Sequence, residues 1–250
     1  MRTYSTSAIV LKRIDLAEKD RILTLYTREL GKVSAVAKGA RKPGSKLSGS
    51  SEPFTYLRGM LSIGRELDVL TQSDIRESFP NAKSAIVSLA YGFYIMELVN
   101  QLTDDRHPNP GLFDTILSAM YVLESGSDPE LTVRYFELNL LESIGYMPQF
   151  DYCVRCGLEM GKERVAFSPE MGGVVCKECG IAPGDSIWVP GALGSYVQAL
   201  METQPHKLKD LTFPEKAKQD LAITLKWHIR YRLERDLKSI DFLDMVSLNS

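Results

Sequence analysis

The chain has 250 residues, of which 44% are hydrophobic and 25% charged, values that are ordinary for a globular protein. Its net charge of −2 excludes a protein that is basic over its whole length and binds nucleic acid with every face. The most apolar long stretch, residues 85–99, contains Ser88, Gly92 and Glu97 and is shorter than a membrane span. No secretory signal is visible at the beginning, so we expect a cytoplasmic protein without a membrane segment.

The two parts of the chain carry opposite charge. Residues 1–80 contain 14 Lys and Arg against 9 Asp and Glu, a balance of +5. Residues 81–250 contain 16 against 23, a balance of −7. Such asymmetry predicts a nucleic-acid-binding face on the N-terminal part and a different role for the rest.

Five short β-strands are predicted in the N-terminal part, over residues 7–14, 21–27, 33–38, 54–63 and 67–75. The strands are rich in β-branched and aromatic residues and are separated by turn residues, and almost no helical pattern occurs. Five strands in about 75 residues are the size of an OB-fold, a five-stranded Greek-key barrel that often binds oligonucleotides. Spacing alone does not separate this fold from an SH3-like barrel.

A Gly- and Ser-rich segment, residues 39–51, connects the third and fourth strands and is expected to be a flexible loop. Residues 30–51 contain no acid and five bases. Lys and Arg beside a barrel suit phosphate contacts, although a solvated loop with incidental charge would have the same composition. The candidate DNA-contacting residues are Lys32, Lys38, Arg41, Lys42 and Lys46, together with Arg21 and Tyr26 on the second strand.

From residue 81 the pattern becomes helical. Apolar residues at three- and four-residue steps predict helices over residues 84–102, 112–123, 129–144, 191–201 and 214–237. His228, Arg232 and Arg235 share one face of the last helix. This basic set suits a solvated face, and its alternative role is to dock an acidic partner.

The four cysteines form two C-x-x-C pairs, Cys153 with Cys156 and Cys176 with Cys179, separated by nineteen residues. This is metal-site spacing, and the two turns together offer the four ligands of a tetrahedral Zn²⁺. The alternatives are four unrelated thiols or two disulfides, which need an oxidising compartment. Four Cys ligands leave no open position, so the sequence predicts one structural Zn²⁺ in a module at about 150–185 rather than a catalytic metal.

No catalytic motif is visible. Residues 39–44 fit the first half of a P-loop, but Ser45 and Lys46 follow where Lys and then Ser or Thr are required. The H-x-E signature of zinc deaminases is also missing. We therefore expect a protein that is not an enzyme. An unrecognised zinc enzyme is the alternative, and it would hold a metal with three protein ligands and a water.

The order of these parts resembles the bacterial RecO family of recombination mediators. The resemblance rests on residues 7–12, 18–27, 31–32, 36–42 and 136–146, followed by Pro148 and Cys153, and it covers essentially the whole chain. It implies an α+β multidomain protein. An OB-fold barrel would occupy residues 1–80 and an all-α domain residues 81–250, with the zinc module inserted in the helical domain.

The resemblance also implies a non-enzymatic role in recombinational repair. RecO-like proteins bind single- and double-stranded DNA and anneal complementary strands. With RecR they help RecA replace single-stranded DNA-binding protein (SSB) on gapped DNA, which places the protein at the nucleoid. Tyr26, Phe54 and Tyr56 become candidates for stacking on bases. The acidic helical part would dock RecR and the SSB tail. The alternative function is a zinc-knuckle RNA-binding or transcription accessory protein.

Overall fold

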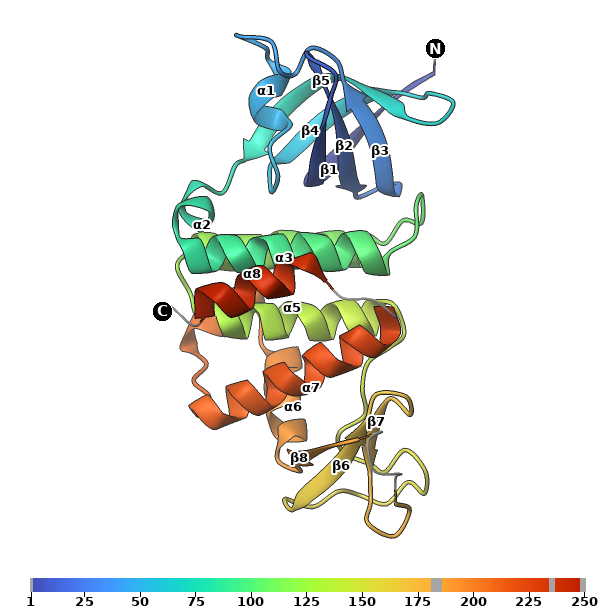
Figure 1. Ribbon diagram of the computed structural model, residues 1–250, viewed down its shortest axis with the longest axis vertical. Coiled ribbons are helices and arrows are strands. Elements are labelled where there is room, and N and C mark those ends of the chain that lie inside the picture. Colours follow the sequence, from blue (N-terminus) through green and yellow to red (C-terminus); the bar gives the residue numbers. More distant parts are fainter. Residues whose placement is uncertain (1, 181–185, 234–236, 248–250) are drawn as a thin grey trace.

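The computed structural model describes residues 2–180, 186–233 and 237–247, and all structural statements below concern these residues. Three parts follow one another along the long axis of the molecule (Figure 1). A β-barrel lies at one end, helices form the middle, and a small β-sheet lies at the other end (Figure 1). The arrangement confirms the predicted α+β class, with a barrel that precedes a helical part.

The barrel consists of five strands: β1 (Thr3–Leu16), β2 (Asp20–Thr27), β3 (Gly31–Ala37), β4 (Tyr56–Ser62) and β5 (Asp68–Glu77). Its strand order is β1-β2-β3-β5-β4, closed by the pairing of β4 with β1. Neighbouring strands are antiparallel except β3 and β5, which pair in parallel through Val36 and Val69. This closure is OB-like, as predicted. Inward-facing side chains such as Val10, Leu25 and Val33 fill the barrel.

The segment 39–51 is folded onto the barrel, and the expectation of a flexible loop is wrong for it. It contains a short helix, α1 (Leu47–Ser50), whose Ser50 is buried. The Gly39 amide donates to Asp20 Oδ1 at 2.7 Å, and the Arg41 amide donates to the carbonyl of Lys19 at 3.0 Å. Short polar side chains can satisfy backbone groups locally, so a Ser- and Gly-rich composition also suits consecutive turns.

The helical part contains α2 (Pro80–Ser84), α3 (Ile86–Leu102), α4 (Pro110–Glu124), α5 (Pro129–Ser143), α6 (Leu193–Glu202), a 3₁₀ turn η1 (Pro205–Asp210), α7 (Glu215–Leu233) and α8 (Lys238–Ser247). Helices α4 and α5 begin at side-chain caps, where Asn109 and Asp128 accept from backbone amides. Helix α3 is apolar on nearly every side, because it packs against the barrel on one side and against other helices on the others.

The helix predicted over residues 214–237 is found as α7, and the helix that follows it, α8, was not indicated by the sequence. Helix α8 packs alongside α3 (Figure 1). Its first amides, those of Lys238 and Ser239, donate to the Glu97 carboxylate of α3 at 3.2 and 2.8 Å. A carboxylate at a helix N-terminus satisfies unpaired amides, so a residue distant in sequence supplies the start signal of α8.

The small sheet is inserted between α5 and α6 and has the order β7-β6-β8. Its strands are β6 (Arg164–Ser168), β7 (Gly173–Val175) and β8 (Ile187–Pro190). Strands β6 and β7 form a hairpin that turns at Pro169 and Gly172, residue types that favour a turn. Strand β8 was not expected, because its four residues fall among turn signals.

The barrel and the helices are joined where β3 begins. Lys32 Nζ donates to the carbonyls of Asn100 at 2.8 Å and Thr103 at 2.6 Å, and it pairs with Asp105 at 3.4 Å. The amide of Arg106 donates back to the Lys32 carbonyl at 2.9 Å. One hydrophobic cluster also crosses the junction, since it contains Ile9, Tyr26 and Phe54 of the barrel part together with the helices.

Replacing Gly31 should measure how closely the two parts are held. Gly31 has a φ of +68°, and a Cβ at this position would lie 2.1 Å from the carbonyl oxygen of His107. Gly126 has a φ of +76° and open space around it. We expect Gly126→Ala to lower the free energy of unfolding by about 1 kcal/mol, the cost of the left-handed backbone alone. Gly31→Ala should lower it by about 3 kcal/mol in urea unfolding. Equal effects would show that the junction accommodates a side chain.

Candidate metal centre and nucleic-acid surface

The four cysteines meet at one point in the inserted module. Cys153 and Cys156 lie in the turn before β6, and Cys176 and Cys179 lie in the turn after β7. The four Sγ atoms lie within 4.8 Å of one another, and all four cysteines are free thiols. Two sulfurs on one tetrahedral Zn²⁺ lie about 3.8 Å apart, given Zn–S bonds of about 2.3 Å. The Sγ atoms of Cys156 and Cys176 are 3.7 Å apart, so the donor set fits one metal ion.

Both turns are shaped to present sulfur. Gly157 and Gly180 have φ values of +74° and +57°, and their amides donate to the carbonyls of Cys153 and Cys176. Burial raises the pKa of Cys153, but N–H groups from Cys176 and its own turn outweigh burial and bring the pKa to about 6. Hydrogen bonding with Cys156, and to a smaller extent with Cys176, raises the pKa of Cys179 to about 12. Four thiolates this close repel one another, and a cation between them removes that repulsion.

The predicted phosphate-binding residues separate into two groups in the structure. Lys38, Lys42 and Lys46 are exposed, and within the part of the chain that the structure describes they form no ion pair. Arg41 is exposed as well, but its guanidinium donates to the Ala17 carbonyl at 2.6 Å. Three lysines on one face of the barrel are therefore free to contact a polyanion.

Arg21 and Lys32 are held by the protein itself. The Arg21 side chain is 12% exposed and contacts Ser51 Oγ at 2.6 Å, Glu52 at 3.0 Å and Asp15 at 3.4 Å. Lys32 makes the contacts to α3 described above. Each of these two cations holds one segment of the protein against another, so neither is among the lysines that are free to contact DNA.

The aromatic residues expected to stack on bases are also engaged. Tyr26 and Phe54 are each 1% exposed, because α3 covers this side of the barrel. Tyr56 is half-buried and meets the ring of Phe113 edge-on at 6.1 Å. Base stacking by Tyr26 or Phe54 is therefore excluded in this arrangement.

The described residues of the basic face expected on the last helix are engaged within the protein. His228 is 0% exposed, and its Nε2 donates to the Tyr146 carbonyl at 2.9 Å. Burial lowers the pKa of His228 and favours the neutral ring. Arg232 donates to the Pro169 carbonyl at 3.0 Å and lies over the Tyr146 ring. Arg235 lies outside the described residues. These side chains attach the cysteine module to α7, so the expectation of a docking face is corrected.

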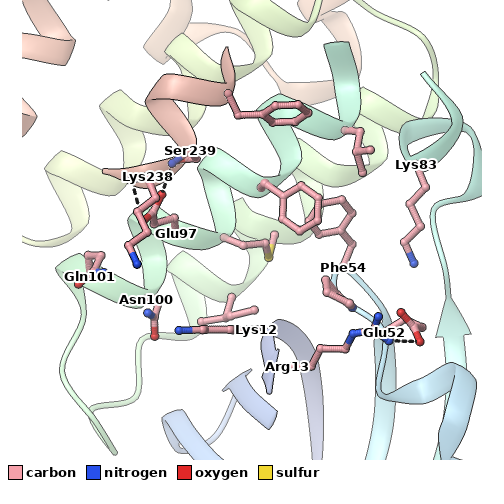
Figure 2. Close-up of a pocket in the computed structure, with 16 residues that line it drawn as sticks. Lys12, Arg13, Glu52, Phe54, Lys83, Glu97, Asn100, Gln101, Lys238 and Ser239 are labelled. Carbon is pink, nitrogen blue, oxygen red and sulfur yellow. Dashed lines mark hydrogen bonds and ion pairs between the residues drawn. The ribbon is translucent and has the colours of Figure 1, made fainter. Parts of the chain in front are cut away.

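A groove that the sequence did not indicate lies between the barrel and the helices (Figure 2). It has a volume of about 890 Å³ and is lined by β1, residues 52–54, α3 and α8. Its floor is apolar and consists of Leu11, Phe54, Leu89, Phe93, Met96 and Phe242. Lys12, Lys83 and Lys238 stand around it, each from a different element (Figure 2). No sequence pattern could find this site, since its three lysines are separated by 71 and 155 positions.

The two acids of the groove are already paired. Glu97 accepts from the first amides of α8, and Glu52 pairs with Arg13 and Arg21. The surroundings of the groove are therefore positive as well as apolar. Desolvation by burial lowers the pKa of Lys83, which lies over the Phe54 ring at 5.9 Å.

Comparison with known proteins decides the family. A model described as "Recombination protein O N terminal" matches residues 1–79, and one described as "Recombination protein O C terminal" matches residues 83–241. The chain belongs to the RecO family. Its function therefore lies in DNA repair and recombination.

Curated relatives named DNA repair protein RecO are similar in sequence to this chain over nearly its full length. The relative from Desulforamulus reducens is 34% identical over 244 residues, 98% of this chain and 95% of that one. The relative from Pelotomaculum thermopropionicum is 36% identical over 245 residues, covering 98% and 94%. A Roseiflexus relative is 34% identical over 247 residues, covering 98% and 86%. The RecO resemblance read from the sequence is confirmed. Of the described helices, none is long and apolar enough to cross a membrane.

Proposed function

We propose that this RecO-family chain binds single- and double-stranded DNA through its barrel and anneals complementary strands. With RecR, it helps to load RecA onto single strands that SSB covers. The observation that carries the proposal is a set of three exposed lysines on an acid-free segment beside an OB-like barrel, none of them in an ion pair with a described residue: Lys38, Lys42 and Lys46. Annealing requires no bond chemistry. It requires cations that lower the repulsion between two polyanions, and mobile Lys side chains supply these.

The proposal divides the work between the two parts of the chain. Residues 1–80 carry the positive balance and would hold DNA, whereas residues 81–250 carry the negative balance and would dock proteins. Phosphate is repelled from an acidic surface, so this division keeps DNA on the barrel. It supports a mediator that touches nucleic acid and partner proteins at the same time.

Removing the three free lysines should weaken binding to all DNA sequences alike. We expect Lys38→Gln, Lys42→Gln and Lys46→Gln together to flatten the slope of log K against log salt concentration by about two to three units. Annealing of complementary strands coated with SSB should slow in parallel. The matched control is Lys162→Gln, Lys207→Gln and Lys209→Gln, which neutralises three exposed lysines far from the barrel. An unchanged affinity and slope in the first variant would contradict the proposal.

We further propose that the four cysteines hold one structural Zn²⁺. The support is the all-sulfur donor set, its spacing and the absence of an open ligand position, which leaves the metal a folding role. Metal analysis of the reduced protein should find one zinc per chain. Cys176→Ser should lose the metal and expose the remaining thiols to a thiol reagent, while the barrel keeps its affinity for DNA. Zinc well below one per chain in reduced protein would contradict the assignment.

The groove between barrel and helices is the site we propose for the acidic tail of SSB. An acidic peptide with apolar side chains would place its carboxylates near Lys12, Lys83 and Lys238 and its apolar groups on the floor. A carboxylate beside Lys83 would offset the desolvation that lowers the pKa of this amine. The site replaces the face of His228 and Arg232, because His228 is buried and the Arg232 guanidinium is bonded to the Pro169 carbonyl.

Reversing charge in the groove should separate tail binding from DNA binding. We expect Lys83→Glu with Lys238→Glu to weaken binding of an SSB tail peptide by about tenfold or more, and the wild-type affinity to fall with added salt. Affinity for single-stranded DNA should stay near the wild-type value. Lys207→Glu with Lys209→Glu serves as the control for net charge. Undiminished peptide binding in the groove variant would show that the tail docks elsewhere.

A further inference from the structure

A continuous row of aliphatic side chains crosses the outer face of the barrel. Ile14 of β1 opposes Ile22 of β2, and Ile22 opposes Val36 of β3. Val36 in turn opposes Val69 of β5, so the row spans four adjacent strands. Ile14 is 50% exposed and the other three are half-buried. None of the four belongs to the hydrophobic clusters that fill the barrel and the helices.

The row differs from its neighbours on the same face. One step closer to the helices, the outward positions are Lys12, Thr24 and Ser34, which oppose one another across β1, β2 and β3. Outward positions of a small barrel are normally polar, because the inward positions already supply the core. A contiguous, solvent-accessible apolar row rimmed by polar residues is typical of an interaction surface.

The charged residues next to the row indicate what kind of ligand it binds. Lys12 lies on one side of the row, and exposed Lys38 and Lys42 follow the end of β3 on the other. Toward the α3–α4 connection, Asp104 and Asp105 line a polar pocket together with Thr24, Lys32 and Ser34. Asp15, which follows Ile14, is paired with Arg21 at 3.4 Å and Arg41 at 3.5 Å. The lysines therefore attract a polyanion to the row, and the acids of the pocket beside it repel one.

The geometry points to this aliphatic row as the surface on which the bases of single-stranded DNA lie, with phosphates at Lys12, Lys38 and Lys42. The inference rests on the proposed function and adds to it the group that distinguishes single strands from duplex. Bases in a duplex are stacked inside the helix, so only a single strand can place base faces on Ile22 and Val36. Aliphatic side chains lack the π-face of an aromatic ring, so each base is held weakly and without sequence preference. A strand held in this way is readily given up to a complementary strand.

Two substitutions that preserve shape test the row. Ile22→Thr with Val36→Thr keeps β-branched side chains on both strands and removes apolar contact. We expect affinity for oligo(dT) to fall about fivefold, with unchanged duplex affinity and an unchanged salt slope, because no cation is lost. Ile75→Thr, which removes an exposed isoleucine elsewhere on the barrel, should change neither affinity.

A gain-of-contact variant makes the test independent of any loss of folding. Ile14→Trp should bind oligo(dT) more tightly than wild type, and the new indole should lose fluorescence when the strand binds. Unchanged oligo(dT) affinity in the Thr variant, with duplex binding still sensitive to the lysine substitutions, would overturn this inference alone. If the lysine substitutions also leave DNA binding unchanged, the proposed function itself fails. Loss of RecR binding by the Thr variant at unchanged DNA affinity would assign the row to a protein partner and overturn the inference as well.

Discussion

The packing of α3 against the barrel is the contact on which the other features depend. Phe54 of the barrel part fits against Gly92 of α3, where an added Cβ would lie 3.0 Å from the ring, and its ring meets Phe93 at 4.8 Å. A residue larger than Gly at position 92 would force the Phe54 ring to shift. The close approach buries Tyr26 and leaves the groove beside Phe54 as the space that the packing does not fill.

This contact changes how an OB-like barrel can meet DNA. Barrels of this type hold single strands with aromatic side chains and a basic groove. Here the aromatic residues near the binding face contribute to the shared core, and the basic residues divide into cations that join segments and cations that face solvent. What remains on the surface is a row of aliphatic side chains and a set of lysines. Such a surface suits transient, sequence-independent contact better than tight storage of a strand.

The cysteine module lies at the opposite end of the molecule from the barrel (Figure 1). It is attached to α7 through His228, Arg232 and the carbonyls that they contact at Tyr146 and Pro169. A metal ion there would stabilise a local turn structure that the helices separate from the barrel (Figure 1). The proposed roles of the metal and of the barrel can therefore be altered independently, by different substitutions in distant parts of the chain.

Local sequence patterns determined the strands of the barrel and the cysteine centre. Alternation and turn residues suffice to place β1 to β5, and the C-x-x-C spacing suffices to group four sulfurs, because each signal acts within a few residues. The tertiary structure alone decided which charges are free and which aromatic rings are buried. Arg21 and Lys46 are both basic residues of the barrel part and were both predicted to contact phosphate. Only Arg21 forms ion pairs with Asp15 and Glu52. The groove, the aliphatic row and the start of α8 arise from contacts between distant segments, and such contacts exist only once the chain has closed the barrel and packed α3 against it.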